Sequence, residues 1–275
     1  MSGPLVTALV PVKSFHPEYL RRAVGSLLAQ DDGGWRALVI SDPSVTDGVE
    51  AVLAAELADP RIEIVVCEGA RLAGALNTGM RRATTEFVAI LLGDDLWAPE
   101  AVRVLGEAIA AHPEGDFFHS ARAIVDGSDA VVSRVYPARE AFGTADFVAG
   151  SPVKHLLCWR RELGLANGGV DETLEEVGTD DWDFTWTMAE AGARFVAVPE
   201  CLYLYRDHRD CPRLTTDVPL SEWLRGRRRI RDKHGVRPWR NRLAAVRAWR
   251  LTLRHCFYRT PLDRPAERVL GTIRR

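Results

Sequence analysis

Residues 71–102, RLAGALNTGMRRATTEFVAILLGDDLWAPEAV, contain the pattern that decides the fold. Apolar residues at helical spacing predict a helix over 72–82, and the continuous apolar run over 86–92 predicts a buried strand. Pro99 suits the first turn of a further helix over 99–111. Helix, buried strand and helix in succession indicate a sheet whose strands run parallel and are connected by helices.

Two adjacent carboxylates, Asp94 and Asp95, follow the predicted strand directly. Like charges at the end of a buried strand cost free energy unless a cation offsets them. The pair therefore predicts a site for Mg²⁺ or Mn²⁺, which bind carboxylates together with substrate phosphates. The alternative interpretation is an N-cap, with Asp95 beginning the helix near Pro99.

The alternation of strands and helices extends to the N-terminus. Apolar runs over 5–12, 37–40 and 62–66 predict buried strands, and helical spacing over 17–29 and 49–57 predicts the helices between them. Such units form an open, mostly parallel sheet with helices on its faces. Ligands of these folds bind beyond the carboxyl ends of the strands, so we expect the site in the segments that follow the strands.

The second half of the chain is less regular. Residues 121–125 and 130–135 predict a hairpin, 179–191 an amphipathic helix, and 195–198 and 201–205 two short strands. We expect the aromatic residues of that helix, Phe184 and Trp186, to pack in the core.

Composition limits the class of protein. The chain has 275 residues, of which 47% are hydrophobic and 27% charged, so we expect a folded protein with one large or two small domains. The longest apolar run, Phe87–Leu92, is too short to span a membrane, and the N-terminus lacks the features of a signal peptide. The five cysteines share no CxxC spacing, which favours reduced thiols, a cytoplasmic location and no zinc finger.

Charge separates the chain into two parts. Residues 221–275 contain 17 Lys and Arg against 4 Asp and Glu, whereas the whole chain has a net charge of −2. We expect an acidic body and a basic tail with helices near 219–234 and 239–257. The tail either lies on an anionic membrane surface, packs on the acidic body, or closes a homodimer. No module for nucleic-acid binding is recognisable, so we expect no nucleic-acid partner.

Three other polar segments are site candidates. Asp42 follows the second predicted strand and either contacts a nucleotide base or ribose, or forms a turn. Asp181, at the start of the helix over 179–191, is either a general base or a helix cap, and capping is favoured on the residues alone. Arg206 and His208 suit a diphosphate or a metal, or belong to a solvated loop.

The order of these segments resembles family 2 glycosyltransferases with the GT-A fold. The similar stretches are LVTALVPVKSFHPEYLRRAVGSLLAQ (5–30), WRALVISDPSVTDG (35–48), the segment 71–102, and GTDDWDFTWTMAEAGARFVAVPECLYLYRDH (178–208). The resemblance implies a mostly parallel, Rossmann-like sheet flanked by helices. It divides the chain into a GT-A domain over 1–218, with a nucleotide-sugar-binding half (1–115) and an acceptor-binding half (116–218), and a basic helical extension over 219–275.

The resemblance also implies roles for individual residues. Those expected to contact the nucleotide sugar are Pro11, Val12, Asp42, Arg71, Asp94 and Asp95. Asp94 and His208 are the implied metal ligands, and Arg206 is the implied diphosphate contact. His155 and Trp182 are expected at the acceptor, with Asp181 as the general base.

Four residues depart from the family's motifs. Leu92 replaces the first Asp of the DXD motif, and Ser41 and Pro43 alter the turn at Asp42. Asp180 replaces the more usual Glu before the base.

The implied reaction is metal-assisted transfer of a sugar from a UDP- or dTDP-sugar to an acceptor hydroxyl, with inversion at the anomeric carbon. The acceptor is a sugar, a lipid-linked glycan or a small molecule. Two alternatives remain: a catalytically degenerate homologue that binds sugar nucleotides, and a nucleotidyltransferase. Against a nucleotidyltransferase, the chain has no glycine-rich loop with a basic residue after the first predicted strand.

Overall fold

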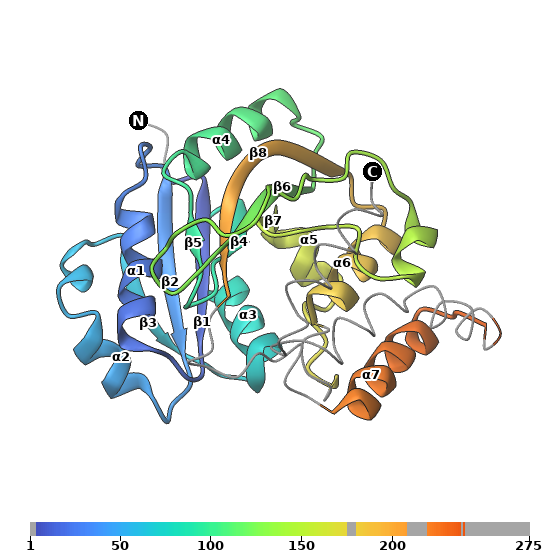
Figure 1. Cartoon of the computed structure of the whole chain (residues 1–275), viewed down its shortest axis with the longest axis horizontal. Coiled ribbons are helices and arrows are strands. Elements are labelled where there is room, and N and C mark those ends of the chain that lie inside the picture. The colour runs from blue at the N-terminus through green and yellow to red at the C-terminus, as the bar shows by residue number, and fades with distance from the viewer. Residues whose placement is uncertain (1–3, 175–179, 208–218, 238, 240–275) are drawn as a thin grey trace.

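The computed structural model describes residues 4–174, 180–207, 219–237 and 239. These residues form an eight-stranded sheet with the order β3-β2-β1-β4-β7-β6-β8-β5 and helices on both faces (Figure 1). Four of the seven strand pairings are parallel, which confirms the expected mostly parallel sheet.

The first half of the sheet follows the predicted alternation. Its parallel strands are β1 (Val6–Val12), β2 (Trp35–Ser41), β3 (Ile62–Val66) and β4 (Phe87–Ile90). The connecting helices are α1 (Pro17–Leu28), α2 (Thr46–Val52), the 3₁₀ turn η1 (Glu56–Ala58) and α3 (Arg71–Arg82). The helix predicted over 49–57 is thus two shorter elements.

Side chains of β1 alternate between two cores, as the pleat of a strand requires. Ala8 and Val10 belong to the core that α1, α2 and α4 (Ala101–Ala111) cover, and Leu9 belongs to the core on the α3 side. Helix α3 approaches the sheet closely, because a Cβ on Gly79 would lie 2.8 Å from Leu9 Cδ2. A larger residue at position 79 would push α3 away from β1.

The second half joins the sheet through an antiparallel strand. Its strands are β5 (Leu96–Trp97), β6 (Phe117–Val125), β7 (Leu157–Arg160) and β8 (Phe195–Arg206). Its helices are η2 (Thr144–Val148), α5 (Arg161–Ala166) and α6 (Asp180–Glu190). Strand β7 pairs antiparallel with both β4 and β6, so the sheet continues across the predicted boundary at 115–116.

Three features of the second half differ from the prediction. The two strands expected over 195–205 are the single strand β8, which has a register shift opposite Ser120 and Ala121. The expected hairpin partner over 130–135 is no strand, and only isolated bridges such as Val125–Val131 form there. Strand β7 and helix α5 are too short to give a periodic signal in the sequence.

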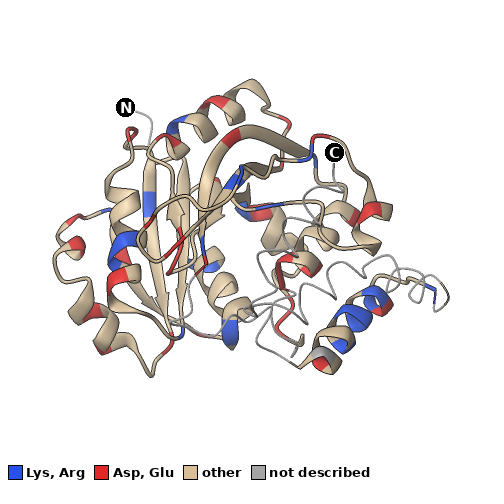
Figure 2. Cartoon of the chain, viewed as in Figure 1, with Lys and Arg blue, Asp and Glu red and all other residues tan. Residues whose placement is uncertain are grey.

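Helix α7 (Leu220–Lys233) confirms the helix expected near 219–234, and Figure 2 shows its concentration of Lys and Arg. It packs on α6, where Lys233 Nζ lies 2.7 Å from Asp183 Oδ2. Packing on the acidic body is therefore the interpretation that holds for this part of the tail. The helix expected over 239–257 lies almost wholly outside the described residues. No helix that the structure describes is long and apolar enough to cross a membrane.

Candidate functional site

The carboxyl ends of β1, β2 and β4 meet at one edge of the sheet. The Asp42 amide donates a hydrogen bond to the Val12 carbonyl at 2.8 Å, which joins the ends of β1 and β2. A Cβ on Gly93 would lie 3.7 Å from Val12 Cγ2 and 3.9 Å from the Pro11 carbonyl oxygen. The structure therefore brings Pro11, Val12, Asp42 and the turn before Asp94 together, as the topology predicts.

Asp42 forms a turn at this edge. Its Oδ1 accepts hydrogen bonds from the Ser44 amide at 3.0 Å and the Ser44 hydroxyl at 2.6 Å. These bonds, the hydroxyl first, hold the pKa of Asp42 below its usual value. The turn interpretation thus holds, and it fixes a half-buried, ionised carboxylate at the end of β2.

Asp95 is buried and is held by β8. It is 1% exposed, and its carboxylate accepts hydrogen bonds from the Tyr203 hydroxyl and the Arg206 amide, both at 2.7 Å. Helix α4 has Glu100 as its N-cap, so Asp95 does not cap it. The expected contact of Asp95 with the nucleotide sugar is not supported, because its carboxylate is buried. Instead, this side chain fastens the turn after β4 to β8.

Arg206 also differs from its expected role. Its side chain has no exposed surface and forms an ion pair with Asp129. Its Nε donates to the Asp94 carbonyl at 2.6 Å and its Nη1 to the Asp126 carbonyl at 2.9 Å. A buried guanidinium with these partners is not placed to contact a diphosphate. It fixes the main chain of Asp94, and Asp94 itself is only half-buried.

Asp181 lies in the first turn of α6 beside His155. The Asp181 side chain is 41% exposed, and its Oδ2 is 3.7 Å from His155 Nε2. Burial alone would raise the pKa of Asp181, but His155, the Trp182 amide and the charge of Arg122 together hold that pKa below its usual value. Asp181 is therefore ionised at neutral pH and able to accept a proton.

The adjacent acid has the opposite character. The pKa of Asp180 is raised to about 7, because burial disfavours its charged form and the charges of Asp181 and Asp183 add to that effect. Paired acids with divergent pKa values are typical of sites that move protons.

Tyr203, which the sequence did not single out, connects the turn after β4 to His155 and Asp181. Its hydroxyl accepts a hydrogen bond from the Leu92 amide at 3.2 Å and donates to Asp95. Its ring centroid is 5.2 Å from that of His155. The turn after β4, Tyr203, His155 and Asp181 are thus in successive contact. The available signal was the pair of tyrosines, Tyr203 and Tyr205, in the otherwise apolar run 201–205.

The other predicted residues are less informative or are placed differently. Trp182 is 3% exposed and donates from Nε1 to the Phe147 carbonyl at 2.9 Å, so it packs inside rather than facing an acceptor. Arg71 is exposed and begins α3 with a φ of 61°, a strained conformation for a residue other than glycine. His208 lies outside the described residues. Phe184 and Trp186 are each 2% exposed, which confirms their place in the core.

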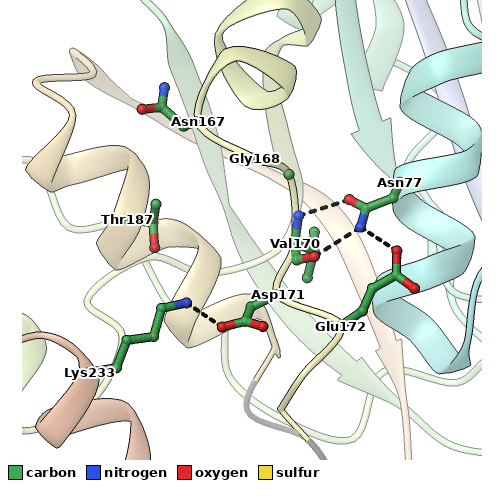
Figure 3. Close-up of a pocket in the computed structure, with 9 residues that line it drawn as sticks. Asn77, Asn167, Gly168, Val170, Asp171, Glu172, Thr187 and Lys233 are labelled. Carbon is green, nitrogen blue, oxygen red and sulfur yellow. Dashed lines mark hydrogen bonds and ion pairs between the residues drawn. The ribbon is translucent and has the colours of Figure 1, made fainter.

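A polar cavity of about 420 Å³ lies elsewhere, between α3, α6, α7 and the segment after α5 (Figure 3). Asn77 lines one side of it and donates hydrogen bonds to the Val170 carbonyl at 2.9 Å and to the Glu172 carboxylate at 2.8 Å. Lys233 closes the other side by pairing with Asp171 at 2.7 Å. None of the predicted site residues that the structure describes lines this cavity.

The sequence model described as Glycosyl transferase family 2 matches residues 7–144, half of the chain. The chain belongs to glycosyl transferase family 2. The matched residues include the carboxylates after β2 and β4. Among the described residues of this family 2 glycosyltransferase, no group of three or more His, Cys, Asp or Glu is placed to hold a metal.

Curated relatives of this glycosyltransferase match over part of their length. The O-antigen biosynthesis protein RfbC of Myxococcus xanthus is 27% identical over 208 residues, 74% of this chain and 16% of the relative. The UDP-Glc:alpha-D-GlcNAc-diphosphoundecaprenol beta-1,3-glucosyltransferase WfgD of Escherichia coli is 34% identical over 99 residues, 35% of this chain and 38% of the relative. The matches span between 13% and 38% of these relatives' lengths.

Solved structures share the fold at low identity. S. aureus TarS 1-349 in complex with UDP-GlcNAc aligns with a TM-score of 0.65 at 16% identity, covering 94% of this chain and 74% of that one. The mannosyltransferase PcManGT from Pyrobaculum calidifontis, in complex with GDP-Man and Mn²⁺, aligns with a TM-score of 0.60 at 20% identity, covering 98% and 79%. These likenesses confirm the GT-A fold expected from the sequence.

Proposed function

We propose that this protein transfers a sugar from a nucleotide-diphosphate sugar, a UDP- or dTDP-sugar, to an acceptor hydroxyl with inversion. The observation that carries the proposal is Asp181, an ionised and accessible carboxylate beside His155 and connected through Tyr203 to the turn that holds Asp94. Family membership and the nucleotide-bound neighbours of the same fold support a nucleotide-sugar donor.

The reaction needs one base and one displacement. The acceptor oxygen gives its proton to Asp181 and attacks the anomeric carbon on the face opposite the nucleotide. The bond from that carbon to the diphosphate breaks, and the electron pair leaves with the nucleoside diphosphate. The transition state has oxocarbenium character, as in glycoside hydrolysis, and a single displacement inverts the carbon.

A divalent cation, Mg²⁺ or Mn²⁺, belongs to the proposal. Asp94 offers a half-buried carboxylate on a main chain that Arg206 fixes. One protein carboxylate together with diphosphate oxygens is a donor set that Mg²⁺ accepts, so the residues present fit. When bound, the ion would neutralise the charge of the leaving diphosphate. His208 remains a proposed second ligand.

The remaining donor contacts are proposed from their place at the sheet edge. Pro11, Val12 and Asp42 border the space beyond β1 and β2, where the base and ribose would lie. Arg71 begins α3 beside the same edge. His155 would orient both the acceptor and the Asp181 carboxylate.

The acceptor is proposed to be a glycan, either free or lipid-linked. Relatives named for O-antigen and diphosphoundecaprenol-linked synthesis support this class. A lipid-linked acceptor would bring the protein, otherwise cytoplasmic, to the inner face of a membrane. The homodimer remains the alternative use of the tail.

The proposal is tested with the full chain and the variants Asp94→Ala, Asp181→Asn and Asp180→Asn. Calorimetric titration with UDP, dTDP and GDP, with Mn²⁺ or EDTA, measures donor binding. Release of nucleoside diphosphate from the matching sugar nucleotide, with water or simple glycosides as acceptor, measures turnover. We expect Asp94→Ala to lose metal-dependent binding. Asp181→Asn should bind normally but turn over about 10²–10⁴-fold more slowly.

Three outcomes contradict the proposal in different ways. Unchanged turnover in Asp181→Asn, with loss in Asp180→Asn, would move the base to the neighbouring acid. Absence of binding to all three nucleotides would favour a non-catalytic homologue, consistent with the departures at Leu92 and Ser41. Release of pyrophosphate from a nucleoside triphosphate and a sugar 1-phosphate would favour a nucleotidyltransferase.

A further inference from the structure

Helix α7 buries basic side chains against the half of the protein that carries Asp181. Arg227 is 8% exposed and Arg231 is 3% exposed, whereas the Arg228 side chain between them is 76% exposed. Arginine is seldom this buried unless its charge serves a purpose in the structure. The burial of Arg227 and Arg231 therefore requires an explanation, whereas the exposure of Arg228 does not.

The first contact of α7 is with the residue next to the proposed base. The Arg227 guanidinium lies 4.3 Å from the centroid of the Trp182 ring, and that of Arg231 lies 5.5 Å from it. Stacking of a guanidinium on tryptophan is favourable, more so when both are desolvated. Because Trp182 directly follows Asp181, these contacts fix the first turn of α6.

The second contact is with the segment that leads to His155. Arg227 Nη2 donates to the Ala149 carbonyl at 2.6 Å, and Arg231 Nε donates to the Val148 carbonyl at 2.8 Å. These carbonyls end η2, where a cation complements the partial negative charge of a helix C-terminus. From there the chain runs through Ser151 to His155.

The third contact satisfies a buried acid of α6. Asp183 is 1% exposed, and its carboxylate pairs with Lys233 Nζ at 2.7 Å and with His234 Nε2 at 3.0 Å. The His234 ring stacks on Trp186 at 4.2 Å. An unpaired buried carboxylate would be strongly destabilising, so α7 is needed for α6 to hold Asp183 inside.

Charge also connects Arg227 to Asp181. Among the described residues, neither Arg227 nor Arg231 has a carboxylate within ion-pair distance. Burial and the like charge of Arg231 lower the pKa of Arg227 to about 9, and the negative charge of Asp181 opposes that shift. The charged groups that interact with Asp181 are Asp180 on α6, His155 before β7, Arg122 on β6 and Arg227 on α7; Asp183 acts on Asp180.

We propose that Arg227, supported by Arg231, is a positioning residue that holds Asp181 and His155 in register by clamping the start of α6 to the segment before β7. The inference rests on the proposed function, because it assigns α7 to the acceptor side of that reaction. Neither arginine touches the donor edge at Asp42 and Asp94. The clamp acts on proton transfer and leaves donor binding unchanged.

The test compares Arg227→Met with Arg228→Met in the full chain. Arg227→Met keeps the apolar stem of the side chain but loses the guanidinium, with its charge and its bond to Ala149. We expect its kcat for nucleoside diphosphate release to fall about ten- to hundredfold, because small misplacement of a catalytic group has effects of this size. The affinity for the nucleotide should stay within about twofold of wild type, since the donor edge is untouched. Arg228→Met should match wild type in both.

The pH profile separates positioning from general stability. Removing the Arg227 cation should raise the pKa of Asp181, so the acidic limb of the profile should move to higher pH in Arg227→Met. Arg227→Lys keeps the charge, and should keep the wild-type limb while its kcat stays reduced. This variant also serves if Arg227→Met does not fold.

Two results would overturn the inference. A wild-type kcat and pH profile in folded Arg227→Met would show that the base does not depend on α7. Equal losses of kcat and nucleotide affinity would indicate a general structural role. Asp181→Asn distinguishes the two proposals: if it retains turnover, the assignment of the base fails, whereas if it is inactive and Arg227→Met is normal, only the clamp fails.

Discussion

The proposed donor edge, at the ends of β1 and β2, and the proposed acceptor side, around Asp181, are built in different ways. At the donor edge, parallel strands and the local turn at Asp42 place Pro11, Val12 and Asp42. On the acceptor side, Asp181 depends on single side-chain contacts from β8, the segment before β7 and α7. Substitutions should therefore be tolerated differently in the two regions, and this difference can be tested.

The largest expected effect breaks the contact between the two regions. Asp95→Asn puts an amide where the buried carboxylate accepts bonds from Tyr203 and from the Arg206 amide. The amide nitrogen cannot accept, so one buried donor loses its partner, at a cost of about 1–3 kcal/mol in the free energy of unfolding. Urea denaturation measures this change.

The matched control is Asp94→Asn at the adjacent, half-buried residue. We expect it to change the unfolding free energy by less than about 0.5 kcal/mol, as surface substitutions usually do. It should instead weaken metal-dependent nucleotide binding. If Asp94→Asn destabilised the protein as much as Asp95→Asn, the assignment of separate roles to the two acids would be wrong.

An intermediate effect comes from pH and concerns the acceptor side alone. Burial would lower the pKa of His234, but its bonds to Asp183 and Glu190 outweigh burial and raise it. A raised pKa in the folded state adds stability that is present below the unfolded value near 6.5 and is lost as pH rises through the folded value. Wild type should therefore lose more stability than His234→Gln between about pH 6 and pH 9.

Urea denaturation of both proteins at the two pH values isolates the contribution of His234, since other groups titrate equally in each. An equal loss in the two proteins would mean that His234 stays neutral beside Asp183. Lys233 would then offset the charge of Asp183 without help from His234.

The smallest effect on stability is expected at the outward face of α7. Arg225 and Arg228 are exposed, so Arg225→Glu and Arg228→Glu together should leave the melting temperature nearly unchanged. If the tail binds anionic membranes, the same pair should reduce co-sedimentation with vesicles of anionic lipid. Equal pelleting of the variant and wild type would remove the membrane interpretation for this face.

The strands and helices of the N-terminal half could be predicted well, because each is indicated by the pattern of apolar residues within its own segment. Buried runs such as 62–66 and the helical spacing over 72–82 lie within single elements. The carboxylates after β2 and β4 could also be placed, because topology alone brings strand ends together.

The roles of Asp95, Arg206 and Trp182 could not be predicted, for a shared physical reason. Each is buried by a partner distant in sequence: Tyr203 for Asp95, the Asp94 carbonyl for Arg206, and Arg227 for Trp182. A polar residue in a motif gives the same local signal whether it faces a ligand or a neighbouring element. Only the packing of β8 and α7 decides between the two.

The bonds of Asp95 also determine how this protein can be recombined with its relatives. A chimera joined at 115–116 would take Asp95 from one parent, and the strand that satisfies it from the other. One of its partners, the Arg206 amide, is main chain and would be supplied by any parent whose strand keeps its register. The other, the Tyr203 hydroxyl, requires a tyrosine at that position. Acceptor halves with a tyrosine there should give folded hybrids more often than those without one.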